Sequence, residues 1–189
     1  MATSLPDRGK EKYIEGKVKK MDKLIKEITL AFKGVKETTI EADKLIINAK
    51  KDDVLDILNF FKERGYDHLS LISCVDWIES GQFELIYILS SYSEQNGEKH
   101  IILKTKIPRE NPKFKTVIPI FENAEPYERE IHELFGINFE NHHRLTHLFL
   151  ERNYKISPFR KDFNTREYVK EFFEKIPFVE DKNEDRKRA

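Results

Sequence analysis

The segment from Pro126 to Ile137, PYEREIHELFGI, constrains the fold of this chain more than any other part of the sequence. Ile131, Leu134 and Phe135 are spaced three and four residues apart, so they share one helical face that can be buried. Gly136 follows at once and is suited to end the helix in a left-handed conformation. The segment is also densely charged, beyond what solubility alone requires, with Glu128, Arg129, Glu130 and Glu133.

A second informative segment, SPFRKDF, spans Ser157–Phe163 and combines a proline, aromatic rings and charges. Pro158 restricts the backbone, Phe159 can anchor in a groove, and Arg160 can fork onto a carboxylate. Taken alone, this segment is typical of a basic turn on a protein surface.

Apolar spacing over the first 137 residues predicts an α+β body. In chain order we expect an amphipathic helix over residues 10–32, strands at 35–40 and 45–49, a helix at 54–64 with its N-terminus at Asp52 or Asp53, a buried strand at 69–75, and a hairpin of 82–91 with 101–107 around Asn96-Gly97.

From Asn138 onward the sequence is irregular, with a short helix expected at 165–175 that Asn164 caps. An irregular stretch of this length buries little of itself and is expected to need another surface. We therefore divide the chain into a body, residues 1–137, and an extended partner-binding arm, residues 138–189.

Composition excludes several classes of function. The chain of 189 residues balances 34 basic against 34 acidic residues, which argues against a nucleic-acid surface. The single cysteine, Cys74, cannot alone hold an iron–sulfur cluster. No apolar run approaches the length of a membrane-spanning helix, and the first residues lack the apolar core of a signal peptide. A role at a membrane would therefore depend on a partner.

Other candidates for chemistry are weak. His132-Glu133 begins like a zinc-protease motif, but Gly136 stands where the second histidine is needed. His143 and His147 lack further ligands in a helical setting. Glu128 and Glu130 could serve as an acid–base pair, yet no nucleophile or glycine-rich phosphate loop accompanies them.

Together the two segments resemble the signature of the 30 kDa (C-type) subunit family of respiratory complex I, which complex I-related membrane-bound hydrogenases and sulfane sulfur reductases share. The resemblance covers about residues 50 to 163, including the strand that ends at Asp76-Trp77. At residues 141–147 only His142 and Arg144 match the family pattern. This departure favours a hydrogenase-like or sulfur-reducing relative and leaves those two types open.

The resemblance implies an α+β fold with a mixed sheet and flanking helices, and a non-catalytic subunit without a cofactor. Such a subunit braces the catalytic large subunit and the iron–sulfur small subunit of a peripheral arm on the cytoplasmic side of the membrane. Iron–sulfur clusters then belong to partner subunits, where a nickel–iron centre is left open. The implied partner-binding residues are Tyr127, Glu128, Arg129, Glu130, Glu133, Phe135, Gly136, His142, Arg144, Phe159, Arg160, Lys161 and Asp162.

Three alternatives remain open. The chain could be the C-type subunit of a true NADH- and quinone-linked complex I. It could instead be a free-standing small enzyme that uses Glu128 and Glu130, which turnover by the isolated chain would reveal. A generic adaptor outside redox metabolism is the third. Copurification with redox subunits would favour the interpretation as a bracing subunit.

We expect the isolated protein to be colourless and to bind no iron or nickel stoichiometrically, because one cysteine and scattered histidines supply no ligand set. Elemental analysis of tag-free, refolded protein tests this expectation. A stoichiometric metal content would contradict it.

Overall fold

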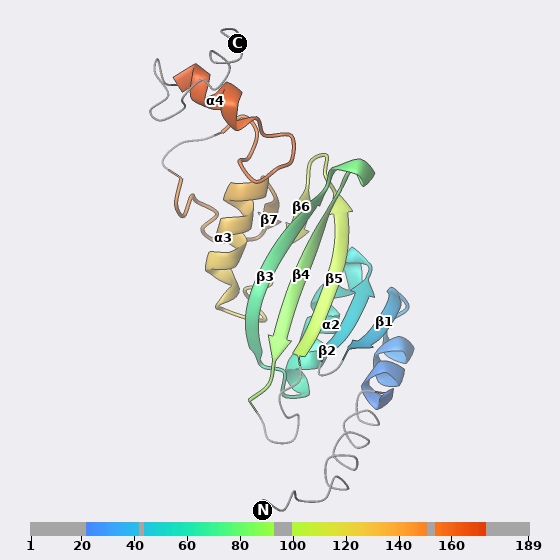
Figure 1. Cartoon of the computed structure of the whole chain (residues 1–189). Helices are drawn as coiled ribbons and strands as arrows, with labels where there is room; N and C mark the ends of the chain where they lie inside the picture. Colours follow the sequence, from blue (N-terminus) through green and yellow to red (C-terminus); the bar gives the residue numbers. More distant parts are fainter. Residues whose placement is uncertain (1–21, 42–43, 93–99, 151–153, 173–189) are drawn as a thin grey trace, which may run out of the picture.

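The core of the fold is a five-stranded sheet. The computed structural model describes residues 22–41, 44–92, 100–150 and 154–172. The strands lie in the order β1-β2-β5-β4-β3, and only β2 and β5 run parallel (Figure 1). Their bounds are β1 Val35–Glu41, β2 Lys44–Ala49, β3 His68–Trp77, β4 Gln82–Ser90 and β5 His100–Pro108.

Helices flank this sheet, and a small second sheet lies beside it. The helices are α2 Val54–Glu63, α3 Ala124–Phe135 and α4 Thr165–Phe172, with short 3-10 turns at Lys51–Asp53 and Ile78–Ser80. Residues 22–31 are also helical. The second sheet pairs β6 Lys113–Lys115 with β7 Asn138–Glu140 in parallel. This arrangement confirms the predicted α+β fold with a mixed sheet and flanking helices.

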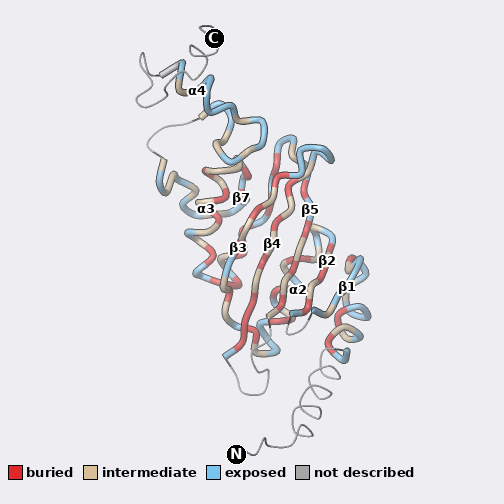
Figure 2. The backbone as a smooth tube through the Cα atoms, in the orientation of Figure 1, coloured by how far each residue is buried: buried red, intermediate tan, exposed pale blue. Residues whose placement is uncertain are grey.

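The hydrophobic core lies on one face of the five-stranded sheet. Side chains alternate along β4, so every second one is fully buried: Phe83, Leu85, Tyr87 and Leu89. Helix α2 faces the same core with Leu58 and Phe61, because its apolar residues share one side. Figure 1 shows α2 behind the sheet and α3 beside β3, and Figure 2 shows buried and half-buried residues alternating along the strands.

Local predictions in the body hold with two corrections. The pairing of β4 with β5, from Phe83 opposite Ile107 to Leu89 opposite Ile101, confirms the predicted hairpin. The stretch predicted as a buried strand is instead the edge strand β3, and its Leu71 is 39% exposed. Its side chains alternate between buried and less buried positions, as in β4, because one face of this sheet is packed on the core and the other is more open.

The second correction concerns the start of α2. Asp53 holds the N-cap position, but its side chain makes no capping hydrogen bond because a 3-10 turn leads into the helix. The cap expected for α4 is present, since Asn164 Oδ1 accepts from the backbone amides of Arg166 and Glu167. The Asn96-Gly97 turn and the predicted helical residues 10–21 lie outside the described residues.

The helix at residues 22–31 packs on the chain's own body. Ile28 is fully buried and Leu24 nearly so. Phe32, just beyond the helix, meets the ring of Phe60 on α2 edge to face, with centroids 5.7 Å apart. These contacts join the described part of the amphipathic stripe to α2. No helix within the described residues is long and apolar enough to cross a membrane.

Replacing Ile28 by alanine should lower the free energy of unfolding by about 2–5 kcal/mol, because it leaves a cavity between this helix and the core. The matched control is Leu30→Ala, since Leu30 is 86% exposed on the same helix. That change should stay within about 0.5 kcal/mol. Chemical denaturation of the two variants compares them, and equal effects would show that the helix does not pack as described.

Candidate partner interface

Helix α3 ends at a glycine that the surrounding structure requires. Gly136 has a φ of 76° in the left-handed region. A Cβ atom at this position would lie 2.9 Å from Ser157 Oγ, closer than such atoms approach in proteins. On the same turn, Phe135 contacts the rings of Phe83 and Phe159 with centroids 6.0 and 5.9 Å away. The predicted helix and its C-terminal glycine are confirmed, and they bring the segment 157–163 onto the body.

Glu128 points into the body. It is fully buried, and its carboxylate accepts hydrogen bonds from Thr116 Oγ1 at 2.5 Å and from the Val117 amide at 2.7 Å. Burial raises the pKa of Glu128 to about 7, and the two hydrogen bonds only partly oppose this shift. This glutamate therefore joins α3 to the segment before it.

Arg129 also points inward, toward the irregular segment. Its guanidinium donates to the Thr146 carbonyl at 3.0 Å and to the His147 carbonyl at 2.8 Å, and it pairs with Glu125 at 3.3 Å. The whole residue is only 7% exposed. Arg129 thus donates hydrogen bonds to backbone carbonyl groups of a segment that lies outside any helix or strand.

Glu133 lies one helical turn after Arg129 and accepts hydrogen bonds from backbone amides of the same segment. Its carboxylate accepts hydrogen bonds from three successive backbone amides, those of Leu148, Phe149 and Leu150. Burial alone would raise the pKa of Glu133, but these hydrogen bonds and the nearby His147 outweigh it and hold that pKa below its ordinary value. The carboxylate thus fixes a loop that forms no sheet or helix.

These contacts show that part of the arm packs on the chain's own body, whereas its binding to a partner stays a prediction. Residues 144–150 lie against α3, and the Phe159 amide donates to the Leu134 carbonyl at 2.9 Å. Strand β7, the first part of the arm, pairs with β6 of the body. The irregular backbone is held because buried charges on α3 satisfy its polar groups, which apolar periodicity does not reveal.

A second charge cluster, which sequence reasoning missed, holds the segment 157–163. Arg109 donates to both carboxylate oxygens of Asp76, at 2.9 and 3.2 Å, and to Asp162 at 2.5 Å. The Lys161 amide also donates to Asp76, which is 4% exposed. Burial alone would raise the pKa of Asp76, but these bonds outweigh it and lower that pKa. The fork expected of Arg160 is therefore made by Arg109, while Arg160 lies 3.5 Å from Asp162.

The remaining predicted interface residues fall into two groups. Tyr127 is tied to the body, since its hydroxyl donates to the Ser70 carbonyl at 3.0 Å. The others lie partly or fully at the surface: Glu130, His142, Arg144, Phe159, Lys161 and Asp162. Large apolar side chains that the sequence analysis did not single out are exposed beside them, namely Phe149 at 69% and Ile156 at 40%. Their role in partner binding stays a prediction.

The two glutamates that the sequence offers as an acid–base pair lie in different surroundings. Glu128 is fully buried whereas Glu130 is half-buried, as expected of side chains two positions apart on a helix. Within the described ranges, no group of three or more histidine, cysteine, aspartate or glutamate side chains is placed to hold a metal ion. Cys74 is buried, which raises the pKa of its thiol well above the usual range.

Comparison with known proteins agrees with the resemblance seen in the sequence. A sequence model of the respiratory-chain NADH dehydrogenase 30 Kd subunit family matches residues 47–169. The C-type subunit of the F(420)H(2) dehydrogenase of Methanosarcina mazei is 31% identical, over 74% of this chain and 89% of its own. The C-type subunit of the NADH-quinone oxidoreductase of Moorella thermoacetica is 28% identical, over 76% of this chain and 95% of its own.

A solved structure extends the likeness to three dimensions. A chain of the membrane-bound sulfane sulfur reductase, an archaeal respiratory membrane complex, superposes with a TM-score of 0.74 and 29% identity. The match covers 86% of this chain and 97% of that chain. A match of this extent exceeds the length of residues 1–137, so it includes part of the arm.

The buried Glu128 should make stability depend on pH. Its folded-state pKa of about 7 lies above the ordinary 4.5, so the folded chain keeps a proton that the unfolded chain loses. The contribution of Glu128 to the free energy of unfolding is complete below pH 4.5. It falls by roughly 3 kcal/mol as pH rises to about 7.

Glu128→Gln should remove this dependence, so the wild type should lose stability relative to the variant across that window. Denaturant unfolding at several pH values measures the difference. Glu130→Gln on the outward side of α3 is the matched control, and its effect should stay small. A difference between wild type and Glu128→Gln that does not change with pH would contradict the burial described.

Proposed function

The chain belongs to the respiratory-chain NADH dehydrogenase 30 Kd subunit family, and from this membership we propose that it is a non-catalytic bracing subunit. It is a subunit of a complex related to complex I, as its relatives in F(420)H(2) dehydrogenase and NADH-quinone oxidoreductase indicate. In our proposal it holds the catalytic large subunit against the iron–sulfur small subunit in the peripheral arm of a membrane-bound, ion-translocating complex.

The observation that carries this proposal concerns two charged residues of the segment 126–137, Arg129 and Glu133, which bind the chain's own backbone. Arg129 and Glu133 form hydrogen bonds with the backbone of residues 146–150. They are thus occupied structurally, and their effect is to hold an irregular segment that presents Phe149 to solvent. A fixed segment with exposed aromatic side chains suits contact with another protein, because its ordering has already been achieved before binding.

The type of complex is a further part of the proposal. The likeness to a chain of the sulfane sulfur reductase covers 86% of this chain and 97% of that chain, which supports a sulfur-reducing or hydrogenase type. A quinone-linked NADH complex is the alternative, favoured by the relative from Moorella thermoacetica. The subunit would then lie on the cytoplasmic side, attached through partners that carry iron–sulfur clusters, and a nickel–iron centre if the complex is a hydrogenase.

The experiment removes the exposed aromatic side chains and measures assembly. The double variant Phe149→Ala/Phe159→Ala should lower copurification with the partner subunits at least about tenfold, because aromatic anchors dominate interfaces. Both side chains are mostly exposed, at 69% and 60%, so the free subunit should stay folded and lose at most about 1.5 kcal/mol with the ring contact between Phe159 and Phe135. Leu30→Ala removes a side chain that is 86% exposed and far away along the chain, and this control should assemble normally.

Redox activity per assembled complex provides the second measurement. We expect the residual assembled complex to keep normal turnover, because the subunit braces its partners without taking part in the chemistry. A double variant that assembles fully but yields an inactive complex would contradict the proposal and favour a catalytic role.

A further inference from the structure

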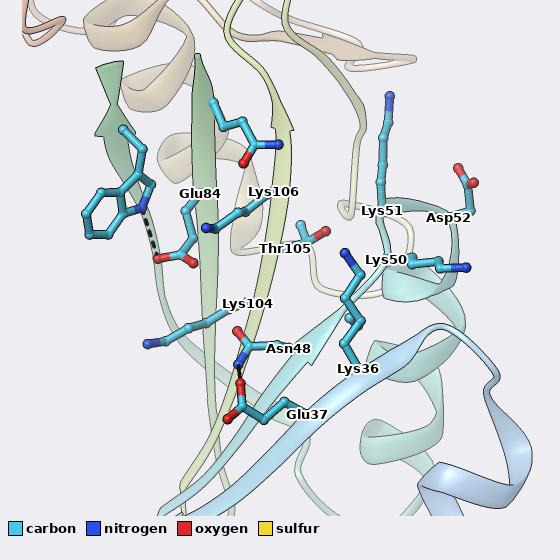
Figure 3. A pocket seen from close by; sticks show the side chains of 13 residues that line it. Lys36, Glu37, Asn48, Lys50, Lys51, Asp52, Glu84, Lys104, Thr105 and Lys106 are labelled. Atoms are coloured by element: carbon cyan, nitrogen blue, oxygen red, sulfur yellow. Dashed lines mark hydrogen bonds between the residues drawn. The ribbon is translucent and has the colours of Figure 1, made fainter. Parts of the chain in front are cut away.

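A hollow lies on the face of the sheet that helices α2 and α3 leave open. It has a volume of about 950 Å³ and opens where the parallel strands β2 and β5 end. Figure 3 shows its labelled side chains rising from β1, β2, β4, β5 and the 3-10 turn after β2. None of its lining residues lies on α3, but through Trp77 it adjoins the cluster of Asp76 and Arg109, and the Lys161 ammonium lies 6.0 Å from the Trp77 ring centroid.

The hollow carries an excess of positive charge. Its lining includes five lysines, Lys36, Lys50, Lys51, Lys104 and Lys106, against the three carboxylates Glu37, Asp52 and Glu84. Two of these carboxylates accept hydrogen bonds, Glu37 from Asn48 and Glu84 from Trp77. None of the five ammonium groups forms an ion pair with any residue in the described ranges. Like charges gathered this closely raise the local potential and favour an anionic partner.

An apolar surface adjoins these lysines. Trp77 lines the hollow and is 42% exposed, and the Lys106 ammonium lies 5.8 Å from its ring centroid. Two positions along the strands from Lys104, a row of aliphatic side chains crosses the same face. Cross-strand pairing aligns this row, which consists of Ile46, Ile102, Ile88 and the 39% exposed Leu71.

We propose that this face docks an acidic amphipathic segment of a partner subunit. Carboxylates of the segment would meet the unpaired lysines, while apolar side chains would cover the aliphatic row and Trp77. The inference rests on the proposed function, because it needs a complex with other subunits. It adds a second contact surface to the arm, of different chemistry and on another face of the body.

Charge argues against the occupants that another copy or the two ends of this chain could supply. A second copy of this chain would bring the same lysines against each other, and like charges across an interface are unfavourable. Residues 1–21 of this chain carry six basic and three acidic residues, so they share the sign of the hollow. Residues 173–189 carry five acidic and five basic residues, so they offer no net negative charge. A partner with an excess of carboxylates is therefore the occupant that the electrostatics favour.

Charge reversal in the whole complex tests the proposal. Lys104→Glu/Lys106→Glu should lower copurification with the partner subunits at least about tenfold in low salt. The matched control, Lys113→Glu/Lys115→Glu on β6, makes the same charge change at the same spacing and should assemble like the wild type. If the wild type itself fails to copurify, the proposed function is wrong. If the wild type and both variants assemble equally, only the docking face is wrong.

A photocrosslinker identifies the occupant without relying on these variants. With p-benzoylphenylalanine in place of Lys36, the assembled complex should yield a crosslink to a partner peptide with more acidic than basic residues. A crosslink to a second copy, to another segment of this chain, or to a basic peptide, or no crosslink at all, would overturn the proposal. Titration of the free subunit with inorganic phosphate is the last arm, because tight phosphate binding here would assign the hollow to a small anion.

Discussion

Glu133 accepts hydrogen bonds from three successive backbone amides, and the position of the irregular segment depends on this carboxylate. Arg129, one helical turn earlier, donates to the two carbonyls that precede those amides. A stretch without helix or sheet must still satisfy its polar backbone groups when they are removed from water. Helix α3 supplies one positive and one negative side chain on the same face for this purpose. The aromatic side chains that the segment displays are placed as a consequence.

The parts of this structure that were predictable from the sequence are those that depend on local periodicity. The alternation from Phe83 to Leu89 indicated strand β4, and the three- and four-residue spacing before Gly136 indicated helix α3 and its end. The position of β3 at the sheet edge was not predictable, because strand order depends on contacts between distant segments. An apolar run such as 69–75 looks the same in a central strand and in an edge strand whose outer face is half-covered.

The direction of the charged side chains also escaped prediction. A glutamate in an acidic helix usually faces solvent, yet Glu128 is fully buried because Thr116 and Val117, in the segment just before α3, satisfy its oxygens. The pair of Asp76 and Arg109 joins residues 33 positions apart. The one indication of this pair in the sequence was Asp76, which lies at the end of an expected strand. The family resemblance singled out Glu128, Arg129 and Glu133, and the structure shows that these side chains bind within the chain, whereas partner binding by the exposed residues stays a prediction.

In the free subunit, buried charges on α3 hold the segment 144–150 on the body before any partner binds. Amide hydrogen exchange of the isolated chain tests this central claim most directly, with Glu133→Gln for comparison. We expect the amides of Leu148, Phe149 and Leu150 to exchange slowly in the wild type and much faster in the variant, because a neutral amide cannot accept from all three. Fast exchange of these amides in the wild type, slowing only in the complex, would contradict the claim.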